Sequence, residues 1–234
     1  MSYEAGRMTS FYPVYLDLRD RPCVVVGGGA MAESKVLGLL DAGAQVTVVA
    51  PEVSEGLSDL EARGRIRVLR RSYRRGDLDG ARVVIAACED RSVNHQIWQE
   101  AEDLGVPVNA VDDMPHCNFI APAVHRQGDL AVAISTGGKS PALAVRLRDR
   151  IASLVGPEYG AFLTLLGAWR EEVAARISGP RARAALWYRV VDSDAIDLVR
   201  GGDLAGANAR IARLLSEARR ELQAAQPSAY GEEG

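Results

Sequence analysis

A run of glycines in the first third of the chain has the spacing of a dinucleotide-binding loop. Gly27, Gly28 and Gly29 follow the apolar run Cys23–Val26, and Ala32 completes the pattern G-x-G-x-x-A. Such glycines permit a tight turn and a close approach of the backbone to a pyrophosphate, and the helix that follows offers free N–H groups to phosphates. The pattern predicts a nucleotide site, with a glycine turn that binds no dinucleotide as the alternative.

An acidic residue at the end of the next apolar run fits the ribose of such a nucleotide. Glu52 follows Val46–Val49, and no arginine stands beside it to receive a 2′-phosphate. A carboxylate in this place can accept hydrogen bonds from ribose hydroxyls, which favours NAD over NADP as the cofactor. The preceding Pro51 could instead aim the side chain elsewhere.

Two neighbouring carboxylates, Asp112 and Asp113, follow the strand-like run Val106–Val111. We expect this run to be a central strand, and in open α/β sheets the carboxyl ends of the strands face the ligand crevice. A carboxylate there can act as a general base or a metal ligand. Because an Asp-Asp pair before Met114-Pro115 is also good turn chemistry, a plain turn fits the same residues.

Hydroxyls, glycines and one lysine gather before a predicted helix. The segment reads Ser135-Thr136-Gly137-Gly138-Lys139, and Ser140-Pro141 then has the form of an N-cap followed by the first helical residue. The segment could bind an anion at the helix start, or it could be a capping loop only.

The histidines and cysteines show no known metal-ligand spacing. His116, Cys117 and His125 lie near one another in the sequence, and His95 falls inside a predicted helix. We assign no metal ligand, and a transient ferrous site stays open. The three cysteines are odd in number and form no CxxC pair, which favours a reducing compartment.

Strand-like and helix-like segments alternate over the first 113 residues and predict an α/β fold with a Rossmann-type parallel sheet and helices on both faces. The strands are expected at Cys23–Val26, Val46–Val49, Ile66–Leu69, Val83–Cys88 and Val106–Val111, and the helices at Ala30–Ala42, Ser54–Arg63 and Ser92–Leu104. The edge of this sheet would position the glycine loop and the two aspartates.

The remainder of the chain has a different pattern. Two short strands, Ala123–Arg126 and Leu130–Ile134, are joined by a turn, and a helix runs from Pro141 to about Val155. Pro157–Gln226 is helical by period, with breaks near Gly179-Pro180 and Gly201-Gly202, and Pro227–Gly234 is expected to fray. The expected domains are 1–113, 114–155 (a small α+β region) and 156–234 (a helical domain).

The composition is that of an ordinary globular protein, with 47% hydrophobic and 25% charged residues and a net charge of −3. It indicates neither a nucleic-acid partner nor a membrane. Met1–Ser10 lacks the apolar region of a secretory signal, and no early apolar stretch is long enough to span a bilayer, so we expect a cytoplasmic protein.

Taken in order, these segments resemble the precorrin-2 dehydrogenase / sirohydrochlorin ferrochelatase family, including the amino-terminal region of siroheme synthases. The resemblance covers about residues 12–155. It rests on Tyr12–Leu18, Gly27-Gly28-Gly29, Ala32-Glu33-Ser34-Lys35, Ala86-Ala87, Val93-Asn94, Asn109-x-Val111-Asp112, Asn118-Phe119-Ile120-x-Pro122-Ala123 and Ser135–Pro141. Ala110, where the family often has valine, and Thr136, where it has a serine that is sometimes phosphorylated, depart from the pattern.

The resemblance implies NAD-dependent dehydrogenation of precorrin-2 to sirohydrochlorin, with ferrous iron insertion to siroheme in some members, by a homodimer whose central region, here 114–155, dimerises. It implies that Asp112 is the catalytic residue. The cofactor would be lined by Gly27, Gly28, Gly29, Ala30, Met31, Pro51, Glu52 and Ala87, and the polycarboxylate substrate held by Asn118, Ser135, Thr136, Gly137 and Lys139, together with arginines. A non-catalytic NAD-sensing domain and a chelatase without oxidation are the alternatives.

Overall fold

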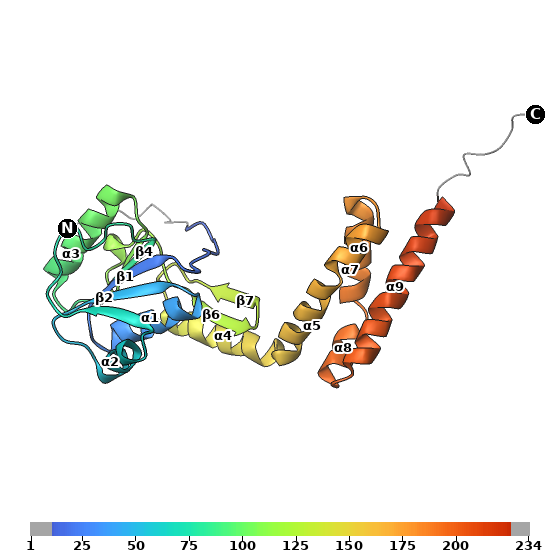
Figure 1. Cartoon of the computed structure of the whole chain (residues 1–234), viewed down its shortest axis with the longest axis horizontal. Helices are drawn as coiled ribbons and strands as arrows, with labels where there is room; N and C mark the ends of the chain where they lie inside the picture. The colour runs from blue at the N-terminus through green and yellow to red at the C-terminus, as the bar shows by residue number, and fades with distance from the viewer. Residues whose placement is uncertain (1–10, 226–234) are drawn as a thin grey trace, which may run out of the picture. The chain divides into compact units, whose positions relative to one another are not determined.

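The computed structural model of the protein describes residues 11–225, so the expected tail Pro227–Gly234 and the segment Met1–Ser10 lie outside the described residues. The chain divides into two compact units. The sheet unit contains the chain up to Pro122 together with Ser135–Pro141, and the helical unit contains Ala123–Ile134 and the chain from Ala142 onward (Figure 1).

Five parallel strands form the sheet, in the order β3-β2-β1-β4-β5. Their bounds are β1 Pro22–Val26, β2 Gln45–Val49, β3 Ile66–Leu69, β4 Val83–Ala86 and β5 Val108–Ala110. Val24 of β1 lies in register with Thr47 of β2 on one side and with Val84 of β4 on the other. The α/β fold class and the Rossmann-type parallel sheet are therefore confirmed, and β3 lies at one side of the sheet.

β5 differs from its prediction in length and in position. It is a three-residue edge strand, whereas a longer central strand was expected over Val106–Val111. Pro107 has no N–H to contribute to a strand ladder. Beyond Ala110 the chain leaves the sheet, because Asp112 has a φ of 58° and a short 3-10 helix, η1 (Met114–His116), follows. The expectation of a central strand before the two aspartates is wrong.

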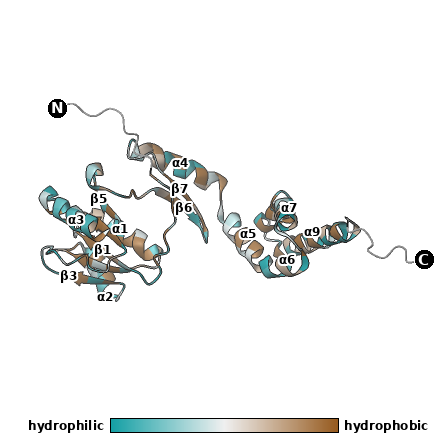
Figure 2. Ribbon diagram, turned by 90° about the horizontal axis from the view of Figure 1, so that it is seen from above, coloured by the Kyte–Doolittle hydropathy of each residue, from teal (hydrophilic) through white to brown (hydrophobic). Residues whose placement is uncertain are grey.

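Helices cover both faces of the sheet. On one face α1 (Ala30–Asp41) and α2 (Glu55–Ala62) pack against alternate strand residues such as Val25 and Val48. On the other face α3 (Arg91–Leu104) packs against Val24 and its neighbours. Figure 2 shows the strands as predominantly hydrophobic, as expected for a sheet buried on both faces.

The crossover between β3 and β4 contains no helix among its described residues, and one buried carboxylate fastens it. Glu100 of α3 is only 2% exposed. It accepts hydrogen bonds from the backbone N–H groups of Gly76 (2.9 Å) and Leu78 (3.4 Å) and from the Tyr73 hydroxyl. These bonds satisfy the buried charge and attach the crossover to α3.

The helical unit begins with the antiparallel hairpin of β6 (Ala123–Gln127) and β7 (Leu130–Ile134). The helices that follow are α4 Pro141–Leu154, α5 Pro157–Ala168, α6 Arg170–Arg176, α7 Pro180–Val191, α8 Ala195–Arg200 and α9 Leu204–Ala225. Helices α5 to α9 share a separate core that includes Phe162, Leu186 and Ile211. The expected breaks near Gly179-Pro180 and Gly201-Gly202 are present, and further breaks separate α5 from α6 and α7 from α8.

Among residues 11–225, no single helix is long and apolar enough to cross a membrane. Only α4 and α5 taken together reach the required length and composition, and they are bent by 67° at the break between them.

Candidate functional site

The glycine loop between β1 and α1 is tightly packed at its first two residues and open at the third. A Cβ on Gly27 would lie 2.3 Å from the carbonyl oxygen of Ala87, and a Cβ on Gly28 would lie 1.8 Å from that of Glu52. Nothing lies within 4 Å of a Cβ position on Gly29. The fold therefore requires the first two glycines, whereas Gly29 leaves space at the start of the helix.

The start of α1 is suited to an anionic ligand. Gly29 is its N-cap and makes no side-chain capping hydrogen bond, and Ala30 and Met31 are exposed. The first N–H groups of a helix have no partner within the helix and carry a partial positive charge. Together with the open space at Gly29, they fit the pyrophosphate of a dinucleotide.

The end of β2 brings Glu52 to this loop, because the Ser54 N–H donates to the Gly28 carbonyl over 2.8 Å. Pro51 and Glu52 are both exposed. Within residues 11–225 the Glu52 carboxylate has no hydrogen-bond or ion-pair partner, whereas the nearby Glu33 accepts a 2.5 Å bond from the Ser54 hydroxyl. The Glu52 carboxylate is thus exposed and free beside the glycine loop.

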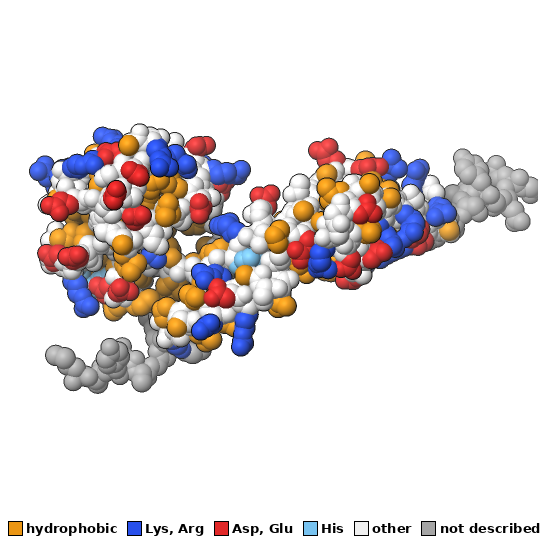
Figure 3. Space-filling view, turned by 90° about the horizontal axis from the view of Figure 1, so that it is seen from below, with side chains coloured by type: hydrophobic (Ala, Val, Ile, Leu, Met, Phe, Trp, Pro, Cys, Tyr) orange, Lys and Arg blue, Asp and Glu red, His pale blue; other side chains and the backbone are white. Residues whose placement is uncertain are grey.

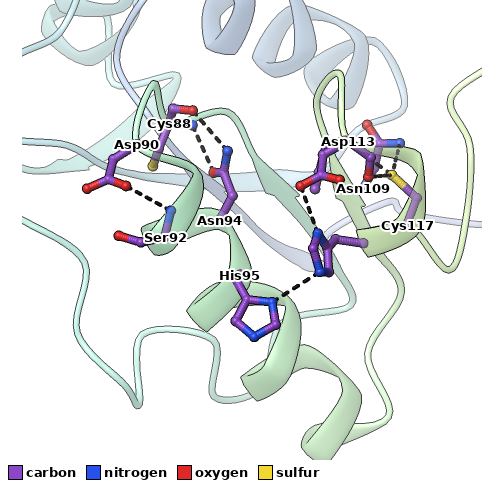
Figure 4. A network of polar contacts seen from close by, with 10 residues as sticks. Cys88, Asp90, Ser92, Asn94, His95, Asn109, Asp113 and Cys117 are labelled. Atoms are coloured by element: carbon purple, nitrogen blue, oxygen red, sulfur yellow. Dashed lines mark hydrogen bonds and ion pairs between the residues drawn. The ribbon is translucent and has the colours of Figure 1, made fainter. Parts of the chain in front are cut away.

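The end of β4 is fixed by a side chain of α3. Asn94, which is 3% exposed, accepts from the Cys88 N–H (3.1 Å) and donates to the Cys88 carbonyl (2.9 Å), as Figure 4 shows. These bonds replace strand pairing, so β4 ends at Ala86 instead of extending to Cys88 as predicted. They also hold Ala87 against Gly27.

Asp112 lies where the chain leaves β5, at the carboxyl ends of the strands. The glycine loop lies at the same end of the sheet. The Ala87 N–H donates to the Val26 carbonyl, and the Val111 N–H donates to the Ala86 carbonyl, so the connections after β1, β4 and β5 adjoin one another. Asp112 is exposed, and its carboxylate has no partner among the described residues. A free carboxylate at this edge can accept a proton from a bound substrate.

The carboxylate of the neighbouring Asp113 already has a hydrogen-bond partner. The Asp113 carboxylate lies 2.7 Å from Nδ1 of His116, and Nε2 of His116 lies 3.1 Å from Nδ1 of His95 on α3 (Figure 4). The rings of His95, His116 and Trp98 also pack together, with centroids 4.8–5.4 Å apart. Nothing in the sequence indicates this series of contacts, because the two histidines are separated by 21 positions and share no pattern.

The loop Ser135–Ser140 lies beside the turn that contains Asp112 and Asp113, which we call the acidic turn. A Cβ on Gly138 would lie 2.8 Å from Cε of Met114, the first residue of η1. The Thr136 hydroxyl accepts from the Ser140 N–H and donates to its carbonyl, which gives this residue a capping role. The exposed Lys139 ammonium has no partner in the described chain, so it can attract a carboxylate.

Two other residues predicted to contact the substrate, Gly137 and Asn118, lie in different surroundings. Gly137 has a φ of 60° and open space around it, and its N–H donates to the Ser135 hydroxyl over 3.0 Å. Asn118 lies at the opposite end of β5, where its amide accepts from the Val108 N–H (2.7 Å) and donates to Glu102 (2.8 Å). The structure therefore groups Ser135, Thr136, Gly137 and Lys139 near the acidic turn but does not bring Asn118 there.

Within the described residues, no three His, Cys, Asp or Glu side chains are placed to hold a metal ion. Nε2 of His125 lies 2.7 Å from the Val155 carbonyl oxygen in the helical unit. Burial raises the pKa of the Cys117 thiol, which donates to the Ala110 carbonyl over 3.1 Å.

Many arginines of the helical unit are paired with carboxylates. Arg189, for example, lies within 3.1 Å of Glu217 and 2.8 Å of Glu221. Figure 3 shows blue and red side chains interspersed there. Such pairs fit a solvated surface.

Comparison with protein families divides most of the chain among three family models. Residues 14–123 match an NAD(P)-binding family, residues 127–154 match the sirohaem biosynthesis protein central family, and residues 158–215 match the sirohaem synthase dimerisation region. The first match supports a nicotinamide cofactor. The dimerisation description falls on 158–215, whereas the sequence analysis placed dimerisation at 114–155.

Individual relatives agree with these matches. The chain is 41% identical to a siroheme synthase of Methylococcus capsulatus over 82% of its own length, and 41% identical to that of Methylobacillus flagellatus over 87%. It spans only 40% and 44% of those proteins.

Among solved structures, the precorrin-2 dehydrogenase SirC matches with a TM-score of 0.68 and 27% identity, over 88% of this chain and 100% of SirC. The shared sheet, the glycine loop and the three successive family matches lead to one conclusion: the chain is related to siroheme synthases over the part of them that it spans, and to the precorrin-2 dehydrogenase SirC.

Proposed function

We propose that this protein oxidises precorrin-2 to sirohydrochlorin with NAD as the hydride acceptor. The observation that carries the proposal is the continuous edge formed after β1, β4 and β5, where an open helix start and the unpartnered Asp112 carboxylate occur together. SirC, which resembles the chain over most of its length, is a precorrin-2 dehydrogenase.

The reaction removes a hydride and a proton from the tetrapyrrole. Bound NAD supplies the hydride acceptor. Asp112 takes the proton, because it is the exposed carboxylate of the pair and Asp113 is bound to His116. The Lys139 ammonium attracts a carboxylate of the substrate and orients the substrate toward Asp112.

The nucleotide is held by Gly27, Gly28, Gly29, Ala30, Met31, Pro51, Glu52 and Ala87. Glu52 accepts hydrogen bonds from the ribose, and its negative charge repels a 2′-phosphate, so NAD binds more tightly than NADP. The protein acts as a homodimer, which the match to a dimerisation region supports.

The test measures NAD binding and precorrin-2 turnover in three proteins: the wild type, Gly29→Asp and Asp112→Asn. Gly29→Asp places a charge at the open helix start and abolishes NAD binding without loss of fold. Asp112→Asn keeps the shape and tolerates the positive φ, but lowers turnover by about 100-fold or more while NAD still binds. Asp103→Asn, which alters an exposed pair with Arg75, is the matched control.

The outcomes separate the alternatives. Full turnover by Asp112→Asn would remove this carboxylate from the reaction, and undiminished NAD affinity in Gly29→Asp would contradict the assigned loop. A wild type that binds NAD but leaves precorrin-2 unchanged would be a nucleotide-sensing module. Ferrous insertion into sirohydrochlorin without NAD would identify a chelatase.

A further inference from the structure

Three side chains fasten the turn that contains Asp112 to α3. The chain Asp113–His116–His95 begins one residue after Asp112 and ends in the first half of α3, with contacts of 2.7 and 3.1 Å. All of its members belong to the sheet unit. No step of the proposed reaction uses these three side chains directly.

The turn needs such a fastening because its backbone is strained. Asp112 has a φ of 58°, and left-handed backbone costs a residue with a side chain about 1–2 kcal/mol. Such a conformation persists only where the surroundings enforce it, and it occurs often at functional sites. Here the Asp113 N–H donates to the Ala110 carbonyl (3.2 Å) and the His116 N–H donates to the Asp113 carbonyl (3.0 Å).

The charge of Asp113 fixes the proton positions along the chain. A carboxylate only accepts hydrogen bonds, so Nδ1 of His116 must be the protonated nitrogen that donates to it. In a neutral His116, Nε2 is then the acceptor, and His95 donates from Nδ1. With both histidines neutral, one set of tautomers satisfies the two contacts and links the turn to the helix.

We propose that His116, bound by Asp113 and supported by His95, is a positioning residue. It keeps the Asp112 carboxylate at the carboxyl ends of β1, β4 and β5, where the proposed reaction takes place. This inference rests on the proposed dehydrogenase function. The contact with Asp113 matters more than the contact with His95, because it is shorter and its acceptor is charged. Without it, Asp112 can relax from its left-handed conformation and move from the reacting proton.

Three substitutions separate the two contacts of His116. His116→Asn places an amide N–H near the position of Nδ1 and keeps the bond to Asp113. His116→Gln reaches the position of Nε2 and keeps only the contact with His95, and His116→Ala keeps neither. We expect kcat for precorrin-2 oxidation to fall by about 10- to 100-fold in the Ala and Gln variants but to remain within about 3-fold of wild type in His116→Asn.

Two further measurements exclude a general loss of structure. KM for precorrin-2 and Kd for NAD should stay near the wild-type values, because neither the glycine loop nor Lys139 is altered. The matched control is His125→Gln, which keeps the contact with the Val155 carbonyl in the other unit and should keep wild-type kcat. Wild-type kcat in His116→Ala, or an equal fall in His116→Asn and His116→Ala, would overturn the proposal.

Hydrogen exchange gives a readout that needs no substrate. Protection of the Asp113, His116 and Cys117 amides should fall in the Ala and Gln variants and persist in His116→Asn. Unchanged protection in His116→Ala would overturn the fastening. If the wild type does not oxidise precorrin-2, the proposed function fails, and the exchange measurement still decides whether His116 holds the turn.

Discussion

Asp112 combines a free carboxylate with a backbone conformation that disfavours any side chain. The two properties explain why the pair Asp112-Asp113 fits both interpretations of the sequence: the pair forms a turn, and the turn leaves one carboxylate free for the proposed reaction. The sequence identified the pair, but it could not show which carboxylate is free, since that depends on a histidine three positions later and on another in α3.

The strain at Asp112 predicts an unusual order of stability. Asp112→Gly and Asp112→Ala both remove the carboxylate, but only alanine retains a Cβ in the left-handed region. We expect the glycine variant to be more stable than the alanine variant by about 1–2 kcal/mol in urea unfolding. Equal stability of the two variants would show that the turn is not left-handed in solution.

One buried and one half-buried thiol predict how the free energy of unfolding depends on pH. Burial raises the pKa of Cys23 from 9.0 to about 11, and it raises the pKa of Cys88 likewise to about 11. A folded-state pKa above the unfolded value contributes stability that is complete below about pH 9 and is lost as the pH rises through about 11. Urea unfolding between pH 8 and pH 11 should therefore show a decline.

Cys23→Ala is the comparison for this decline, because it removes one buried thiol at the sheet core. Its free energy of unfolding should change less between pH 9 and pH 11 than that of the wild type. A decline of the same size in both proteins would assign the effect to other groups.

At the scale of elements, the connections after β1, β4 and β5 form the proposed site, and the sequence predicted some of their features but not others. The glycine loop was found from its spacing, because close packing against Ala87 and Glu52 permits no side chain. The edge position of β5 was not found, because the order of strands depends on contacts distant in sequence. The Asn118 amide was expected near the substrate, but it supports the start of β5.

The packing of the glycine loop predicts different effects on stability for alanine substitutions at two neighbouring positions. Gly28→Ala forces a Cβ to within 1.8 Å of a backbone oxygen, so we expect a loss of about 1–3 kcal/mol of stability. Gly29→Ala meets open space and should unfold near the wild-type midpoint, while weakening NAD binding. Thermal unfolding and calorimetry measure the two effects, and equal stability of both variants would contradict the observed packing.

At the scale of the whole molecule, the sheet unit and the helical unit each have their own core. The hydrophobic period predicted both units, and the resemblance implied dimerisation at 114–155, whereas the dimerisation family matches 158–215. Self-association depends on surface shape, which the hydrophobic pattern of one chain does not specify.

A homodimer predicts that stability depends on concentration. Sedimentation should give twice the chain mass of 25.1 kDa, and the thermal midpoint should rise as the protein is concentrated. A single species at the chain mass, with a midpoint independent of concentration, would contradict the dimer.

α3 is attached to three separate connections of the sheet unit. Asn94 binds the end of β4, His95 contacts the acidic turn, and Glu100 fastens the crossover before β4. Because all three contacts start from one helix, the packing of α3 against the sheet sets the order of the end of β4, of the turn after β5 and of the crossover at once. Loss of that packing would therefore loosen three loops that are far apart in the sequence, without a change in the strands themselves.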